Sequence, residues 1–337
     1  MENNKNETQN QITEDSPEVK PVKKDYVLSA SILISALVLS GAWMYTSGPG
    51  TVEKQTSGLG TNHEQTKISE LEEKVLSSQG VDLPVTWGDL GVKLASVGAI
   101  DAEKFKAIYE DRSAFTNEYK NLLLGQNDGK LKITKNNAGY LLNLFWALGL
   151  ASKNEILEKG EMANAKYGGA GNFASTGGWT IAEGNAMDHY SRHKFFDLTS
   201  EQQALVDKVS KGIYRPCCGN STHFPDCNHG MAMLGLLELM ASQGVSEEDM
   251  WAAALAVNSY WFPDTYMTIA TYMKNKSVDW KDVNPQEILG INFSSAQGYQ
   301  RIASQVVQPQ GQRSGNGCGV DTGAPAAQPR QQSGCGI

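Results

Sequence analysis

The residues best suited to chemistry lie close together in the sequence. Three of the chain's five cysteines and two of its five histidines fall within residues 215–233, which read RPCCGNSTHFPDCNHGMAM. Thiolate and imidazole are ligands of zinc, copper and some iron sites. Their concentration in one short segment predicts a metal or thiol site. The residues that would form it are Cys217, Cys218, His223, Cys227 and His229.

Two more histidines precede this segment, in the sequence DHYSRHKFF. His189 and His193 are four residues apart, a spacing that on a helix places both imidazoles on one face, within reach of a single ion. A closed zinc site needs four ligands in a tetrahedron. Cys218, Cys227 and His229 would supply three of them, and one of the other three histidines of the cluster would supply the fourth.

Two details distinguish this cluster from a zinc finger. No C-x2-C pair is present, and Cys217 and Cys218 are adjacent, so we expect their side chains to diverge from a single tetrahedral ion. Copper is the alternative to zinc, because Met231 and Met233 follow His229 and would add soft donors. The same two methionines fall in an apolar helix, where methionine usually fills gaps in a core. The haem-attachment motif C-x-x-C-H is absent.

A disulfide is the second interpretation of the cysteines. Cys227 could pair with Cys217 or Cys218, leaving one thiol free beside histidines that would lower its pKa. That thiol could exchange with Cys318 or Cys335, each of which lies in a Gly-Cys-Gly setting near the C-terminus. In its purely structural form, the disulfide only staples an interaction domain and performs no chemistry.

Catalytic motifs are weak in this chain. A cysteine nucleophile paired with a histidine would need an orienting acid, for which Asp188 and Asp226 are the nearby candidates. The segment from His189 to His193 lacks the glutamate of H-E-x-x-H, and neither G-x-S-x-G nor a P-loop occurs. The sequence therefore leaves open whether the protein is an enzyme.

An apolar segment near the N-terminus indicates the cellular compartment. Residues 26–45 form a run of 20 residues without a charge, about the length that crosses a bilayer as a helix. Lys20, Lys23 and Lys24 precede it, which predicts a cytoplasmic N-terminus and a single-pass anchor in the cell membrane. A cleaved signal peptide is the alternative. In either case the main domain lies outside the cytoplasm, where disulfides persist.

Composition divides the rest of the chain. Residues 1–25 predict a disordered cytoplasmic tail and residues 46–66 a flexible linker. Residues 67–307 predict an extracytoplasmic helical domain that carries the Cys/His-rich site. Residues 308–337 are rich in Gln, Gly and Pro and predict a disordered tail, whose two cysteines could contact an envelope partner. The net charge of −8 and the absence of a basic stripe argue against a nucleic-acid partner.

The helical domain is expected to be mainly α, with no large sheet. Asp101 predicts the start of a helix over residues 102–125, ended by Gly125, and the apolar run 138–151 predicts a central buried helix. The glycine-rich residues 167–184 predict irregular structure with a short hairpin. Further helices are expected over residues 67–80, 201–212, 231–244 and 247–262.

Residues 214–262 also carry a resemblance. They combine the motif PCCGN, a polar loop, an apolar helix ended by Gly244, and an acid-rich helix start that leads to NSYWF. This order of parts resembles the helical-hairpin thiol domain of cytochrome c maturation proteins and the PCYCGC-type lipoproteins of bacterial envelopes. The C-x-x-C pair of the maturation proteins corresponds here to Arg215 and Cys218. The resemblance implies that Cys218 is a working thiol or metal ligand, with a role in envelope redox or cofactor maturation.

Overall fold

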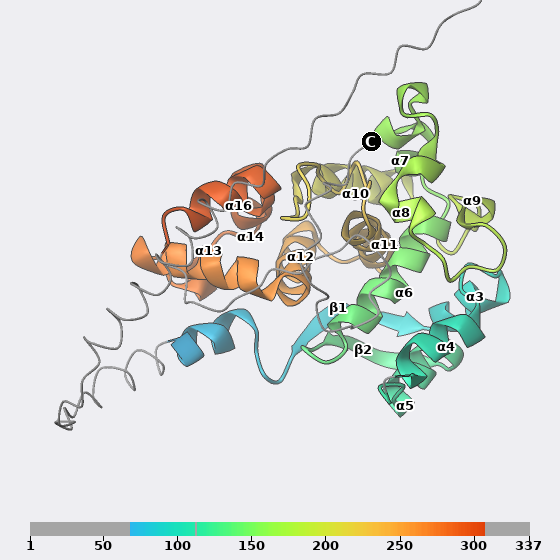
Figure 1. The fold of residues 1–337 in the computed structure, drawn as a ribbon, viewed down its shortest axis with the longest axis horizontal. Coiled ribbons are helices and arrows are strands. Elements are labelled where there is room, and N and C mark those ends of the chain that lie inside the picture. The colour runs from blue at the N-terminus through green and yellow to red at the C-terminus, as the bar shows by residue number, and fades with distance from the viewer. Residues whose placement is uncertain (1–67, 112, 307–337) are drawn as a thin grey trace, which may run out of the picture. The chain divides into compact units, whose positions relative to one another are not determined.

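A computed structural model describes residues 68–111 and 113–306. Within these ranges the chain is mainly helical, as predicted, and its sheet has two strands (Figure 1). The described residues contain no helix of the length and hydropathy needed to span a membrane. The predicted anchor 26–45, the linker 46–66 and both predicted disordered tails, including Cys318 and Cys335, lie outside the described residues.

The small sheet joins two segments far apart in the sequence. After a helix over residues 68–75, β1 (Val81–Gly88) pairs antiparallel with β2 (Asn127–Ile133). Leu83, Val85 and Trp87 alternate along β1 and point into the core, where each is almost fully buried. This period of two is the signature of a strand with one buried face, although the sequence analysis did not identify it.

The chain between the strands forms α3 (Leu90–Ser96), α4 (Ala102–Glu110) and α5 (Asn117–Leu124). The single helix expected over residues 102–125 is therefore wrong. Asp101 does cap α4, and Gly125 does end α5. A second cap interrupts the helix, because the Thr116 side chain accepts a hydrogen bond from the Tyr119 backbone N–H and starts α5 anew.

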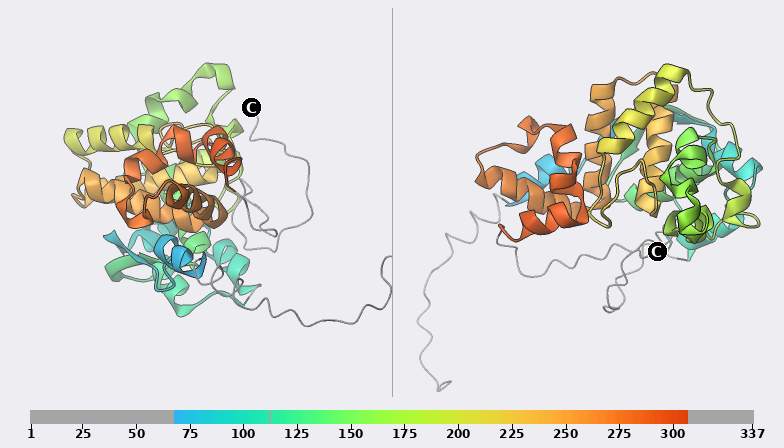
Figure 2. Two further views of the ribbon diagram at one scale, coloured as in Figure 1. Left: turned by 90° about the vertical axis from the view of Figure 1, so that its left-hand side faces the viewer. Right: turned by 90° about the horizontal axis from the view of Figure 1, so that it is seen from above.

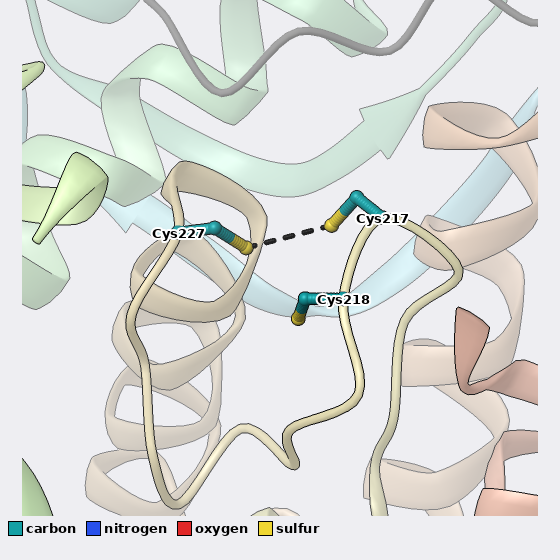
Figure 3. Close-up of side chains that lie close together, drawn as sticks. All are labelled: Cys217, Cys218 and Cys227. Carbon is teal, nitrogen blue, oxygen red and sulfur yellow. Dashed lines mark hydrogen bonds between the residues drawn. The ribbon is translucent and has the colours of Figure 1, made fainter. Parts of the chain in front are cut away.

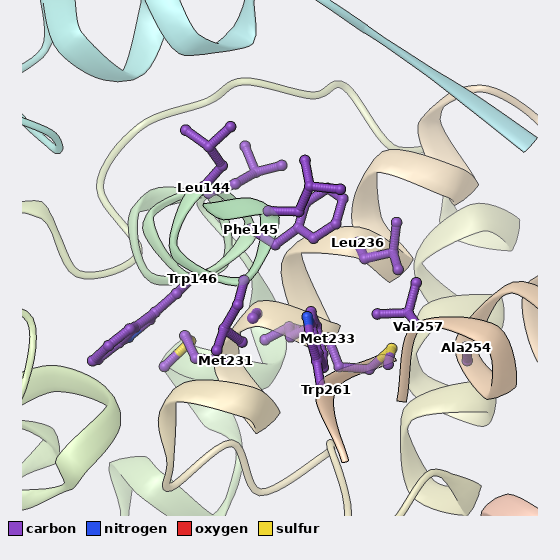
Figure 4. Packing of buried hydrophobic residues seen from close by; sticks show 14 of the residues in the cluster. Leu144, Phe145, Trp146, Met231, Met233, Leu236, Ala254, Val257 and Trp261 are labelled. Atoms are coloured by element: carbon purple, nitrogen blue, oxygen red, sulfur yellow. The ribbon is translucent and has the colours of Figure 1, made fainter. Parts of the chain in front are cut away.

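Two apolar helices form the centre of the core. α6 (Ala138–Ala151) and α11 (Asn228–Ser242) are buried nearly all round, as the sequence predicted for the first (Figure 4). They meet backbone to backbone, because a Cβ atom at Gly149 would lie 2.0 Å from the carbonyl oxygen of Met231. Met231 and Met233 are fully buried in this core. Their position matches the gap-filling role.

The remaining elements surround this pair. The glycine-rich segment forms short helical turns instead of the expected hairpin, and the C-terminal helices gather beside α12 (Figures 1 and 2). These elements are α7 (Glu155–Lys159), η1 (Glu161–Ala163), η2 (Ala165–Tyr167), η3 (Ala170–Asn172), α8 (Ala174–Gly177), α9 (Ala186–His189), α10 (Ser200–Gly212), α12 (Glu247–Trp261), α13 (Pro263–Asn275), η4 (Trp280–Asp282), α14 (Pro285–Leu289), α15 (Ile291–Ser294) and α16 (Ala296–Ala303).

A buried carboxyl group interrupts the apolar surface of α11. Glu238 is 1 % exposed, and its Oε1 accepts a hydrogen bond from the Asn154 side chain. Its Oε2 has no hydrogen-bond partner among the described residues. Burial disfavours the charged form and raises the pKa of Glu238 to about 8. The carboxyl group is therefore protonated at neutral pH.

This pKa predicts a pH-dependent stability. The stability that protonation of Glu238 contributes is complete below the ordinary pKa of 4.5. It is lost as pH rises toward 8, because the unfolded state binds this proton less tightly and unfolding then releases it. The neutral variant Glu238→Gln should match the wild type at pH 5. At pH 8 it should be more stable by a few kcal/mol, on the order expected for such a shift. Urea unfolding at both pH values measures the difference. The exposed control Glu248→Gln should show no such change. An equal effect of Glu238→Gln at both pH values would contradict the assignment.

Candidate metal and thiol site

The cysteines are presented by the loop between α10 and α11, which we call the cysteine loop (residues 213–227). Cys227 is the N-cap residue of α11, whereas Cys217 and Cys218 lie in the bent part of the loop (Figure 3). Backbone hydrogen bonds tie the loop to the C-terminal helices. The Tyr214 N–H donates to the carbonyl of Leu289 over 2.8 Å, and the Ala296 N–H donates to the carbonyl of Cys218 over 3.0 Å.

All three cysteines contribute to one cluster. Their sulfur atoms lie within 4.8 Å of one another, and the Cys217 and Cys227 sulfurs are 3.5 Å apart (Figure 3). The expectation that Cys217 and Cys218 diverge is wrong, because the backbone bends at these residues and brings both thiols to the same cluster. All three cysteines are free thiols. Cys218 and Cys227 are buried, and Cys217 is partly buried.

A buried arginine organises the loop around the thiols. The Arg215 side chain is almost fully buried, and its Nε–H donates to the Cys227 sulfur over 2.9 Å. Its two terminal nitrogens donate to the carbonyl oxygens of Asn220 and Phe224, over 3.0 and 3.1 Å. One of them also donates to the Asp226 carboxylate, forming a buried ion pair. This role of Arg215 was not predicted from the sequence.

A glycine in α11 makes room for this guanidinium group. A Cβ atom at Gly230 would lie 2.5 Å from Cζ of Arg215, so another residue there would displace the arginine. A glycine lowers helix stability by about 1 kcal/mol relative to alanine. Gly230 lies in the first turn of a buried helix, directly after His229. A glycine at this position indicates in the sequence that a bulky group approaches the helix there.

The three thiols of the cluster have pKa values shifted in different directions. Burial acts to raise the pKa of Cys227, but hydrogen bonds from the other two thiols, the charge of Arg215 and the ring of His229 hold it well below its ordinary value. Hydrogen bonding to its neighbours and burial raise the pKa of Cys217 well above the ordinary value. The hydrogen bond with Cys217 lowers the pKa of Cys218, but interaction with Cys227 and burial outweigh it and raise that pKa to about 12.

Arg215 supplies the positive charge of this cluster. Burial raises the pKa of Asp226, and the charge of Arg215 opposes that rise. Arg215 thus pairs with Asp226 and donates a hydrogen bond to the Cys227 sulfur, which favours the anionic form of both groups. The start of α11 adds partial positive charge at Cys227.

His229 lies beside the cluster with one nitrogen atom unpaired. It is 5 % exposed, and its Nδ1 has no hydrogen-bond partner among the described residues. The ring packs against Phe262, with centroids 4.3 Å apart, and approaches the edge of Trp261. Of the predicted histidines, His229 is the one that lies in the first turn of α11, the helix that Cys227 caps.

The other three predicted histidines lie apart from the thiols. Within residues 68–111 and 113–306, one group of three or more potential metal ligands has its ligand atoms close together. It consists of the three cysteines and contains no histidine. His223 Nε2 is 2.7 Å from Oδ1 of Asp207, and both residues line a separate cavity of about 620 Å³ beside α10. His189 and His193 contact each other, although α9 ends at His189 and the two do not share a helix face.

Comparisons of the chain with protein families, curated proteins and solved structures found no match. The resemblance of residues 214–262 to cytochrome c maturation proteins and PCYCGC-type lipoproteins therefore stays a prediction. The local geometry of the cysteine loop carries the functional argument.

The buried ion pair predicts a large effect of removing one partner. Arg215→Met leaves the Asp226 carboxylate buried without its counter-ion, which should lower the free energy of unfolding by about 3–5 kcal/mol. Adding Asp226→Asn should recover part of this loss, since the unpaired charge is then absent. Urea unfolding of the two single variants and the double variant gives the coupling. The exposed pair of Lys74 and Asp279 supplies the control, and Lys74→Met should have little effect. A loss in Arg215→Met no larger than in the control would refute the role of the ion pair.

Proposed function

We propose that this protein binds one thiophilic metal ion, zinc or copper, through Cys217, Cys218 and Cys227, with His229 as the fourth ligand. The observation that carries the proposal is the convergence of three sulfur atoms within 4.8 Å. Tetrahedral zinc with Zn–S bonds of about 2.3 Å holds its sulfurs about 3.8 Å apart. The observed cluster would need only small shifts to reach that spacing. Thiolate ligands also suit Cu⁺.

The cysteines would bind the ion as thiolates. Metal binding would deprotonate Cys217 and Cys218, because the thiolate is the ligand form of cysteine. The ion would then replace the two protons as the positive charge among the sulfurs. Arg215 would remain hydrogen-bonded to the Cys227 sulfur as an outer partner that orients the ligand. A divalent ion that replaces two protons leaves the net charge of the cluster unchanged.

A structural role is better supported than sensing or delivery. The cysteine loop is hydrogen-bonded to Leu289 and Ala296, at the end of α14 and the start of α16. An ion that fixes the loop would therefore also fix the C-terminal helices against the core. Two of the three thiols and His229 are buried, which is typical of a closed metal site. As part of this proposal, residues 26–45 anchor the chain in the cell membrane with this domain outside the cytoplasm.

Metal analysis of the full chain tests the proposal directly. The protein, purified without added metal and kept from air, should contain one zinc or copper ion per chain. Cys217→Ser and Cys227→Ser should each reduce bound metal to background, because each removes one of three sulfur ligands. The matched control Cys335→Ser removes a cysteine outside the described residues, and this variant should retain the ion. Stoichiometric metal in Cys227→Ser would contradict the proposal.

A thiol–disulfide function is the second candidate, and one observation favours it. The Cys217 and Cys227 sulfurs are 3.5 Å apart, and Cys227 has the lowered pKa of an attacking thiolate. Oxidised glutathione would first form a mixed disulfide with the more exposed Cys217. The Cys227 thiolate would then attack the Cys217 sulfur and expel glutathione as a thiol. Exchange with Cys318 or Cys335 would pass the disulfide to the tail or to an envelope partner.

The same preparation separates the two candidates. Absence of metal, together with a Cys217–Cys227 disulfide formed on addition of oxidised glutathione and located by peptide mass mapping, would establish the redox function. Absence of both metal and a reactive thiol would leave an interaction domain without chemistry.

A further inference from the structure

A second pair of metal-ligating side chains lies outside the cysteine loop. The Nδ1 atom of His189 is 3.1 Å from the Nε2 atom of His193, and the rings are tilted by 31°. The Nε2 atom of His189 lies 2.9 Å from the carbonyl oxygen of Glu183. A carbonyl oxygen only accepts hydrogen bonds, so His189 Nε2 carries a proton. A single proton then lies between the two facing nitrogens.

The backbone holds these two rings in place. Ser191, between them, has φ of 50°, which is uncommon for a residue other than glycine. Its Oγ accepts a hydrogen bond from the backbone N–H of Asn154, and its own N–H donates to the carbonyl of Leu150. The His193 N–H donates to the carbonyl of Ala151 over 2.8 Å. The pair is thus anchored to the end of α6 and is organised before any ligand arrives.

We propose that His189 and His193 form a second metal site, which takes one divalent ion of the zinc class in place of the proton between their rings. With metal–nitrogen bonds of 2.0–2.1 Å, the observed separation of 3.1 Å corresponds to an N–metal–N angle of about 100°. The Glu183 carbonyl would keep His189 in the tautomer that offers Nδ1 to the ion, as outer partners of metal-bound histidines do.

Binding at this pair needs no net loss of a proton. When the ion binds Nε2 of His193, the proton on that atom is replaced by one on Nδ1, exchanged through solvent. His193 is partly exposed, so the remaining coordination positions open to water. This site is therefore open and exchangeable, whereas the proposed cysteine site is closed.

Cobalt titration of the full chain tests the second site. Co²⁺ replaces Zn²⁺ in such sites, and bound thiolates reveal themselves by sulfur-to-cobalt charge-transfer absorption in the near ultraviolet. Equilibrium dialysis of the full chain, after its resident metal is removed with a chelator, should count two Co²⁺ ions per chain. His193→Ala should lose one ion and keep the charge-transfer band. Cys227→Ser should lose the band and keep the other ion. Because the two losses are separate, failure of one site is distinguishable from failure of the other.

Two controls make the result specific. His223→Ala removes a histidine that bonds Asp207, and it should retain both ions. His189→Asn, whose fold is checked by circular dichroism, should repeat the loss seen in His193→Ala. An unchanged number of bound Co²⁺ ions in both His193→Ala and His189→Asn would overturn the second site. Loss of the charge-transfer band in His193→Ala would also overturn it, since the two sites would then not be independent.

Discussion

The buried guanidinium group of Arg215 is the interaction on which the candidate site depends. Moving such an ion out of water costs several kcal/mol unless its charge and its donors are paired. Here the donors are paired within the cysteine loop, by two backbone carbonyls, the Asp226 carboxylate and the Cys227 sulfur. Satisfying one side chain therefore folds the loop around it and places three thiols together. Gly230 permits this approach by leaving space at the first turn of α11.

The thiol cluster and the fold support each other. α11 supplies the N-cap position of Cys227 and packs backbone to backbone on α6 through Gly149 and Gly235. At its other end, the cysteine loop is bonded to the chain at Leu289 and Ala296. A change in the charge or ligation of the thiols would thus reach both the central helices and the C-terminal ones. This coupling is the physical reason for favouring a structural ion.

Local patterns in the sequence predicted the helices well and the long-range details poorly. The central helix 138–151 and the cap at Asp101 follow from apolar composition and capping chemistry, which act over a few residues. The break before α5 depends on Thr116 competing as a second cap. The buried Glu238 accepts a hydrogen bond from Asn154, which is far away in the sequence. From the sequence alone, Glu238 is only one polar residue in an apolar helix.

The candidate site was predicted in composition and not in geometry. Clustering of cysteines in residues 217–227 indicated a thiol site, because cysteines are rare elsewhere in the chain. Sequence distance gave no measure of direction, so His223 was grouped with thiols although it bonds Asp207 on α10.

X-ray absorption at the metal edge of the full chain, purified without added metal, tests the central claim most directly. The account predicts three sulfur neighbours at about 2.3 Å and one lighter neighbour. No bound metal, or a shell with fewer than three sulfurs, would contradict it.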